Sequence, residues 1–132
     1  ITKLISNRKD LSAKLPAQLY TYIKDWNWNG MEFRFLKSAL DYSPKNNHFY
    51  VLQIRSKMGS VLLPGDIERE VEAQLEWSYG TKLSSEILLA PYHWSRSSSC
   101  YAFTKRAEPS FVVFSAGYLN NFGHPQGWVV TR

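Results

Sequence analysis

The chain has 132 residues, which is enough for one domain with a buried core but not for two. Hydrophobic residues make up 44% and charged residues 20%, which places the chain among ordinary globular proteins. No apolar stretch reaches the roughly 18 residues that a membrane span requires. The net charge of +5 suits an anionic partner such as nucleic acid, although no basic run stands out. A lone Cys100 excludes an internal disulfide, and a start at Ile1 leads us to expect an excised or processed piece.

The N-terminal half predicts a loop followed by two β-hairpins. Leucines at four-residue spacing over 8–24 are interrupted by Pro16, which predicts a loop with a short helical turn. Asn29-Gly30 separates two alternating apolar runs, and this dipeptide accepts the positive φ angles of a type I′ turn. A second hairpin is predicted between 48–56 and 60–64.

The C-terminal half alternates helices and strands. Ile67, Val71 and Leu75 recur at helical spacing, with Glu68, Glu70, Glu72 and Glu76 directed away from that stripe. The predicted elements are helix 66–77, buried strand 86–91, helix 98–107 and buried strand 110–116. This order predicts an α+β fold, with a mixed sheet and both helices on the same face of it.

Three candidate metal ligands follow three different predicted strands: Asp66, His93 and His124. If these strands are parallel neighbours, their carboxyl ends meet at one edge of the sheet, where open α/β sheets bind ligands. The alternative for Asp66 is a helix N-cap, in which its carboxylate accepts backbone hydrogen bonds. His48 lies at a strand start without such neighbours, so we expect it to be structural or exposed.

Three segments together resemble the C-terminal metallo-β-lactamase-like domain of ComEC-type competence proteins, which internalise DNA. They are LLPGDIEREVEAQL (62–75), ILLAPYHWSRSSS (87–99) and VVFSAGYLNNFGHP (112–125). The resemblance extends over nearly the whole chain from about Trp26. It implies the C-terminal half of an αββα sandwich and a nuclease-type hydrolase that uses two divalent metal ions, zinc or manganese. It also implies that Asp66 and His93 are catalytic and that both bind metal together with His124.

Two departures from the family pattern affect this site. The family motif His-His-Gly-Ser is Tyr92-His93-Trp94-Ser95 here, so Tyr92 replaces an imidazole and Trp94 replaces a small glycine. Tyrosine has a pKa near 10 and is a poor metal ligand at neutral pH. The histidine cluster that the family carries in its first half is also absent. We therefore interpret residues 1–132 as a single partial domain whose upstream half is missing, and we expect it to be inactive alone.

Alternative functions stay open at this point. The chain could be a degenerate, non-catalytic remnant of the same family, or a small module that binds single-stranded DNA through its aromatic residues and positive charge. The resemblance implies DNA as a partner. It also implies a protein of the inner membrane, with this domain soluble and on the extracytoplasmic side.

The missing upstream half leads to a prediction about association. It should leave one sheet face open, with Trp26, Trp28, Phe33 and Phe35 among the residues that line it. Exposed apolar patches drive association, so we expect homodimers or aggregates in isolation.

Overall fold

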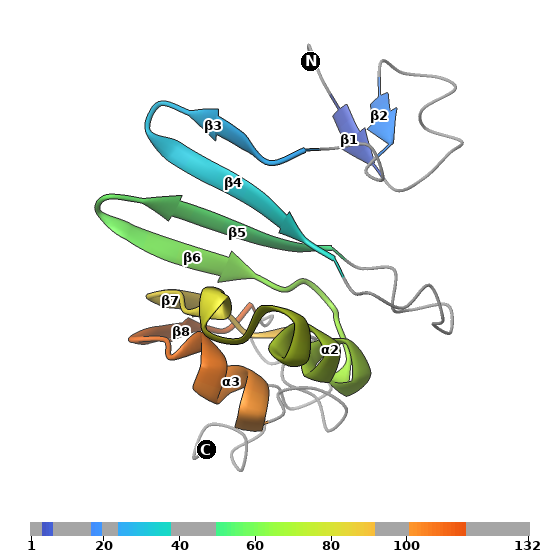
Figure 1. The fold of residues 1–132 in the computed structure, drawn as a ribbon, viewed down its shortest axis with the longest axis vertical. Coiled ribbons are helices and arrows are strands. Elements are labelled where there is room, and N and C mark those ends of the chain that lie inside the picture. Colours follow the sequence, from blue (N-terminus) through green and yellow to red (C-terminus); the bar gives the residue numbers. More distant parts are fainter. Residues whose placement is uncertain (1–3, 7–16, 20–23, 38–49, 92–100, 116–132) are drawn as a thin grey trace.

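Two β-hairpins and two parallel strands form one six-stranded sheet, in the order β3-β4-β5-β6-β7-β8 (Figure 1). The computed structural model describes residues 4–6, 17–19, 24–37, 50–91 and 101–115. The strands are β3 (Trp26–Trp28), β4 (Met31–Leu36), β5 (Val51–Ser56), β6 (Gly59–Leu63), β7 (Ile87–Leu89) and β8 (Phe111–Val113). The helical elements are α2 (Arg69–Tyr79), the 3₁₀ helix η2 (Gly80–Leu83) and α3 (Tyr101–Ala107). The predicted α+β fold is confirmed.

The first hairpin forms as the Asn-Gly turn predicts. Asn29 and Gly30 have φ angles of 48° and 77°, the positive values that a type I′ turn requires at both central positions. The turn pairs Trp26 with Phe33 across the strands, and their rings stack with centroids 4.7 Å apart and an interplanar angle of 7°. Such aromatic pairs stabilise a hairpin beyond the area that they bury.

The second half of the sheet changes direction. β5 and β6 are antiparallel, whereas β6, β7 and β8 run parallel to one another. Parallel neighbours need a crossover connection, and the helices supply it: α2 and η2 lie between β6 and β7, and α3 lies between β7 and β8. The last two strands, β7 and β8, are therefore parallel neighbours.

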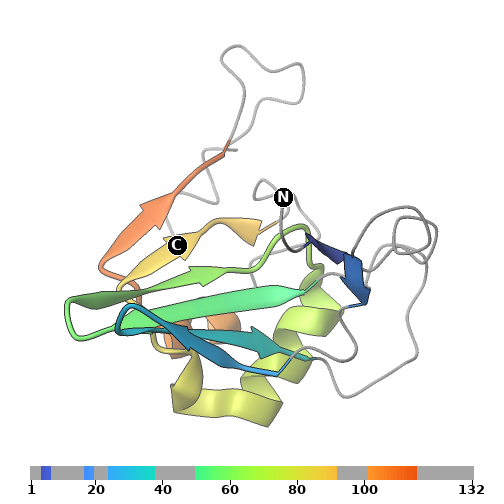
Figure 2. The same cartoon turned by 90° about the horizontal axis from the view of Figure 1, so that it is seen from above.

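The helices cover one face of this sheet, which is where the core lies (Figure 2). Residues from both helices share a single apolar cluster with residues from the strands, so the prediction that both helices lie on the same face is confirmed. The members of this cluster are Leu36, Val51, Leu62, Ile67, Val71, Leu75, Leu83, Leu88, Phe103 and Ala107. The hydroxyl of Tyr79 also fixes the end of α2 to the end of β4, where it accepts a hydrogen bond from the backbone N–H of Lys37 at 3.0 Å.

The opposite face of the sheet carries the other apolar residues of the strands. Residues that are paired across neighbouring strands project to the same side, so the register assigns each strand residue to a face. We call this second surface the open face, because no described element packs over it. Its apolar members are Trp26, Trp28, Met31, Phe33, Phe35, Leu52, Ile54, Val61, Leu63, Ile87, Leu89, Phe111 and Val113.

A buried amide fixes the helical layer to the sheet. Gln53 on β5 is fully buried, and its Nε2 donates to the carbonyl of Lys82 at 3.0 Å and to the hydroxyl of Ser85 at 3.0 Å. Ser85 donates in turn to the carbonyl of Leu83 at 3.0 Å. These bonds hold the segment between η2 and β7 against the centre of the sheet.

Several predictions at the level of single elements were wrong. Residues 17–19 form a strand, β2 (Ala17–Leu19), which pairs in parallel with β1 (Leu4–Ser6) in a separate two-stranded sheet. Glu72, which the sequence directs away from the apolar stripe, is fully buried. The predicted buried strand 110–116 is instead an exposed edge strand, with Phe111 62% and Val113 49% exposed.

We expect the replacement Gln53→Leu to lower the free energy of unfolding by about 1–3 kcal/mol, because it leaves the buried hydroxyl of Ser85 and the partly buried carbonyl of Lys82 without their donor. Urea denaturation followed by circular dichroism measures this change. The exposed turn variant Lys57→Ala serves as the control and should unfold like the wild type. An unchanged midpoint for Gln53→Leu would show that the amide does not hold the helical layer.

Candidate site at the carboxyl edge of the sheet

The carboxyl ends of β6, β7 and β8 lie together at one edge of the sheet. All three strands are parallel, and Leu62, Leu88 and Val112 are neighbours across them. The predicted site requires that the three strands be parallel neighbours, and they are. The segments that follow them therefore start from the same edge of the sheet. This is where ligands bind in open α/β sheets.

Asp66 is the one predicted ligand that lies within the described residues. It follows β6 through Pro64 and the positive-φ residue Gly65, which directs the chain from the strand toward the helical layer. Asp66 is partly buried, and within the described part of the chain its carboxylate makes no hydrogen bond or ion pair. An unpaired carboxylate in a half-buried position is available to a ligand.

The structure does not support the alternative role of Asp66 as a helix cap. The N-cap residue of α2 is Glu68, whose backbone carbonyl accepts hydrogen bonds from Val71 and Glu72, both at 3.0 Å. No side chain caps this helix. Asp66 therefore precedes the cap by two residues, and a carboxylate of structural value would be expected at the cap itself.

The other predicted site residues lie outside the described part of the chain. These are His93 and His124, together with Tyr92 and Trp94 of the altered motif. The convergence of Asp66, His93 and His124 therefore stays a prediction. Among the residues that the structure does describe, no group of three or more His, Cys, Asp or Glu side chains could hold a metal ion. The described residues thus supply one expected ligand and do not form a metal site by themselves.

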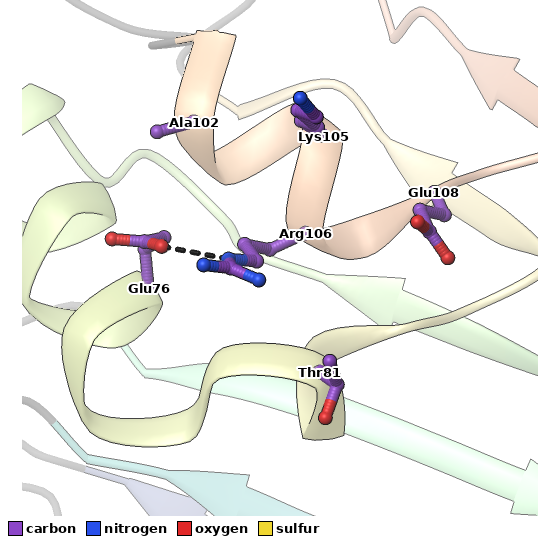
Figure 3. Close-up of a pocket in the computed structure, with 6 residues that line it drawn as sticks. All are labelled: Glu76, Thr81, Ala102, Lys105, Arg106 and Glu108. Atoms are coloured by element: carbon purple, nitrogen blue, oxygen red, sulfur yellow. Dashed lines mark hydrogen bonds and ion pairs between the residues drawn. The ribbon is translucent and has the colours of Figure 1, made fainter.

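A separate pocket lies on the helical layer (Figure 3). It has a volume of about 270 Å³ and is lined by Glu76, Thr81, Ala102, Lys105, Arg106 and Glu108. The Nε of Arg106 bonds to Oε1 of Glu76 at 2.8 Å, and this pair joins α3 to α2. Both side chains are partly exposed, so solvent screens the interaction. Two basic and two acidic residues line the pocket, which gives it no selectivity for either sign of charge.

The sequence alone identified four residues of the open face and missed the other nine apolar members. The missed residues on β6 and β7 belong to runs in which successive residues are all apolar. Alternation of apolar and polar residues therefore cannot show which of them face the helices. The cross-strand register decides this. The missed residues were Met31, Leu52, Ile54, Val61, Leu63, Ile87, Leu89, Phe111 and Val113.

Two curated proteins are similar to the chain over most of its length. Competence protein ComA of Neisseria gonorrhoeae is 32% identical over 108 residues, which are 81% of this chain and 16% of that protein. ComE operon protein 3 of Bacillus subtilis is 29% identical over 96 residues, which are 72% of this chain and 12% of that protein. Both similarities point to the competence proteins.

The competence resemblance read from the motifs is thereby supported. The metallo-β-lactamase-like part of it stays a prediction, since no family model matches the chain. The chain spans less than a fifth of the length of either curated relative. In the described residues, the structure contains no helix that is long and apolar enough to cross a membrane.

We expect Asp66→Ala to change the free energy of unfolding by less than about 0.5 kcal/mol, because its carboxylate has no described partner to lose. Chemical denaturation measures this change, and Gln53→Leu provides a destabilised reference. Loss of a true N-cap costs typically about 1 kcal/mol. A loss of that size in Asp66→Ala would restore a structural role for this carboxylate.

Proposed function

We propose that the chain is part of a DNA-uptake protein that acts in natural transformation. The similarity to a protein named for competence, over 81% of the chain, supports this proposal. The second relative, ComE operon protein 3, is similar to 72% of the chain and supports the same proposal. The chain spans only a small share of each relative. Any activity of the whole relative is therefore a proposal for this chain.

Within that protein, we propose that the chain contributes one side of a metal-dependent hydrolase site of the nuclease class. Asp66 carries this proposal, because a half-buried and unpaired carboxylate follows the first of three parallel strands. The motif resemblance adds His93 and His124 as further ligands, in segments that follow β7 and β8. The described fold, one helical layer on one sheet, has the layers expected of half an αββα sandwich.

The chain alone is expected to lack activity. Two-metal hydrolysis needs enough ligands to hold two ions about 3.5–4 Å apart and to orient a water molecule. One carboxylate and two imidazoles do not meet that requirement, and Tyr92 stands where the family has another imidazole. Zinc or manganese is the proposed cofactor of the complete site, and at most one ion would be held loosely by these three residues.

The two alternative functions are a non-catalytic remnant and a single-strand-binding module. Tyr92 and Trp94 favour the remnant, because both replace residues that the family motif uses. The distribution of charge weakens the second alternative. Nine basic and nine acidic residues lie in the described segments, so the excess of positive charge comes from the rest of the chain and not from the aromatic hairpin and its neighbours. Single-strand-binding surfaces combine aromatic side chains with cations in one groove.

The proposed location follows from the same similarity. Competence relatives favour machinery that is associated with a membrane. From the motif resemblance we propose that this is the inner membrane and that this domain lies on its extracytoplasmic side. DNA is then the proposed partner.

We expect residues 1–132 to cleave neither single- nor double-stranded DNA in the presence of Mn²⁺ or Zn²⁺. The paired reversion Tyr92→His and Trp94→Gly should not restore cleavage, because the ligands of the family's first half are still absent. Gel electrophoresis of labelled oligonucleotides measures the products. Cleavage by the wild-type chain that disappears in Asp66→Ala would show instead that this chain holds a complete site.

In the native protein within its transformable host, we expect Asp66→Asn to reduce transformation frequency strongly, because the proposed site loses an anionic ligand. The matched control is Glu70→Gln, which neutralises an exposed carboxylate on α2. Equal transformation by the two variants would refute the hydrolase site and leave the proposed role in DNA uptake intact. Binding of Mn²⁺, followed by electron paramagnetic resonance, provides a readout that is independent of cleavage.

A further inference from the structure

The edge of the sheet that Asp66 follows also contains the end of β4 and the start of β5. β4 and β6 are both antiparallel to β5, so they end at the edge where β5 begins (Figure 1). The outermost pair of β4 with β5 at this edge is Leu36 with Val51. Lys37 and Tyr50 are the next residues outward from that pair, so they are neighbours at the rim of the sheet, just outside the open face.

The main chain of Lys37 is fixed by the helical layer. The hydroxyl of Tyr79 accepts a hydrogen bond from the Lys37 N–H at 3.0 Å and donates one to the Lys37 carbonyl at 3.3 Å. Tyr79 is the last residue of α2, the helix into which the segment with Asp66 leads. Lys37 itself is exposed. A long side chain on a fixed backbone loses less freedom when it binds a ligand.

The ring of Tyr50 is fixed by the aromatic residues of the first hairpin. It packs edge-on against Phe35, with centroids 6.4 Å apart and an interplanar angle of 72°. Phe35 in turn lies 5.8 Å from Trp26 between ring centroids. Tyr50 is half-buried, and its hydroxyl is the polar end of this aromatic row. Tyrosine commonly has this role at the boundary of an apolar surface, where one end is buried and the other is wet.

The chemistry of this pair suits an anionic oxygen. Burial raises the pKa of the Tyr50 hydroxyl above its ordinary value, because desolvation disfavours the phenolate. The hydroxyl therefore stays protonated at neutral pH and is able to donate a hydrogen bond. The lysine ammonium has three donors and no acceptor. A charged donor next to a neutral one is a suitable arrangement for a phosphate oxygen, whereas a metal ion requires acceptors.

The pair lies close to the candidate site but is separate from Asp66. In the sheet order, β5 is the neighbour of β6, and β4 is one strand further away. Neighbouring strands are about 4.8 Å apart, so Tyr50 and Lys37 lie about 5 and 10 Å from the strand that Asp66 follows, measured across the sheet. This separation suits contact with a phosphate next to the reacting one. The substrate strand would then run along the edge of the sheet from β4 toward β6.

We propose that Lys37 and Tyr50 bind a phosphate of the substrate DNA that flanks the bond cleaved at Asp66. This inference rests on the proposed function and deepens it, because it assigns two substrate-binding residues and the course of the strand. Neither residue is a metal ligand in this arrangement.

The test measures DNA binding without cleavage. The sample is the protein at the length that its own cell produces, with Asp66→Asn and no added divalent metal. Fluorescence anisotropy of a labelled single-stranded oligothymidylate gives the Kd over a series of KCl concentrations. We expect Lys37→Met to raise the Kd about tenfold, as loss of a charge-assisted hydrogen bond does. The slope of log Kd against log [KCl] should fall by about one, because one phosphate contact is lost.

Tyr50→Phe is expected to raise the Kd about threefold to tenfold and to leave the salt slope unchanged, because the hydroxyl carries no charge. Lys57→Met is the matched control, since Lys57 is an exposed lysine in the turn between β5 and β6, at the opposite end of these strands. It should change neither the Kd nor the slope. A role in folding alone would instead lower the thermal midpoint, measured by circular dichroism, without changing the salt slope.

Equal salt slopes for Lys37→Met and Lys57→Met, or an unchanged Kd for Tyr50→Phe, would overturn the inference. Cleavage assays with Mn²⁺ and native Asp66 separate this failure from that of the proposed function. Cleavage that requires Asp66, with the same KM in wild type and Lys37→Met, would refute the phosphate contact and retain the hydrolase. A lower salt slope for Lys37→Met in a protein that cleaves no DNA would refute the hydrolase and retain the contact. Absence of DNA binding would refute both.

Discussion

The cross-strand register of the six-stranded sheet is the constraint on which the rest of the structure depends. It places Leu62 and Leu88 on the face that the helices cover, and it places their neighbours Val61 and Ile87 on the other face. A strand that is apolar on both faces has two surfaces to bury, whereas the described helices cover only one. The open face follows directly from this imbalance between the two sides.

The helical layer is held in place by polar contacts as well as by its core. Gln53 reaches from the middle of β5 to the backbone between η2 and β7, and Tyr79 bonds to the end of β4. Because Gln53 is fully buried, its hydrogen bonds are specific to this docking and costly to lose. They position the segment that leads into β7. The candidate site and the open face are therefore two properties of one arrangement, although they predict different partners.

The distribution of charge separates these two surfaces in function. The described residues carry equal numbers of basic and acidic side chains, and the open face carries none of either. The open face is thus suited to burial against protein. The candidate site instead carries the Asp66 carboxylate, which has no hydrogen-bond or ion-pair partner among the described residues. Any contact with DNA phosphates would have to use basic residues that lie outside the open face.

The sequence by itself determined the features that depend on neighbouring residues. The Asn29-Gly30 turn specified its hairpin because few other residues adopt two successive positive φ angles. The spacing of Ile67, Val71 and Leu75 specified α2, and the alternation of helices and strands specified the α+β class. The motif around Asp66 also indicated the resemblance to competence proteins, with which the similarity to two curated proteins agrees.

Only the tertiary structure decided what depends on contacts between distant segments. The pairing of β1 with β2 joins segments that carry no strong local signal for it. The exposure of Phe111 depends on the position of β8 at the edge of the sheet, whereas its sequence, like that of β7, reads as a buried strand. The start of α2 at Arg69 makes Glu68 the N-cap and places Asp66 two residues before it. In each case the residue type allows two environments, and the packing of the whole chain selects one of them.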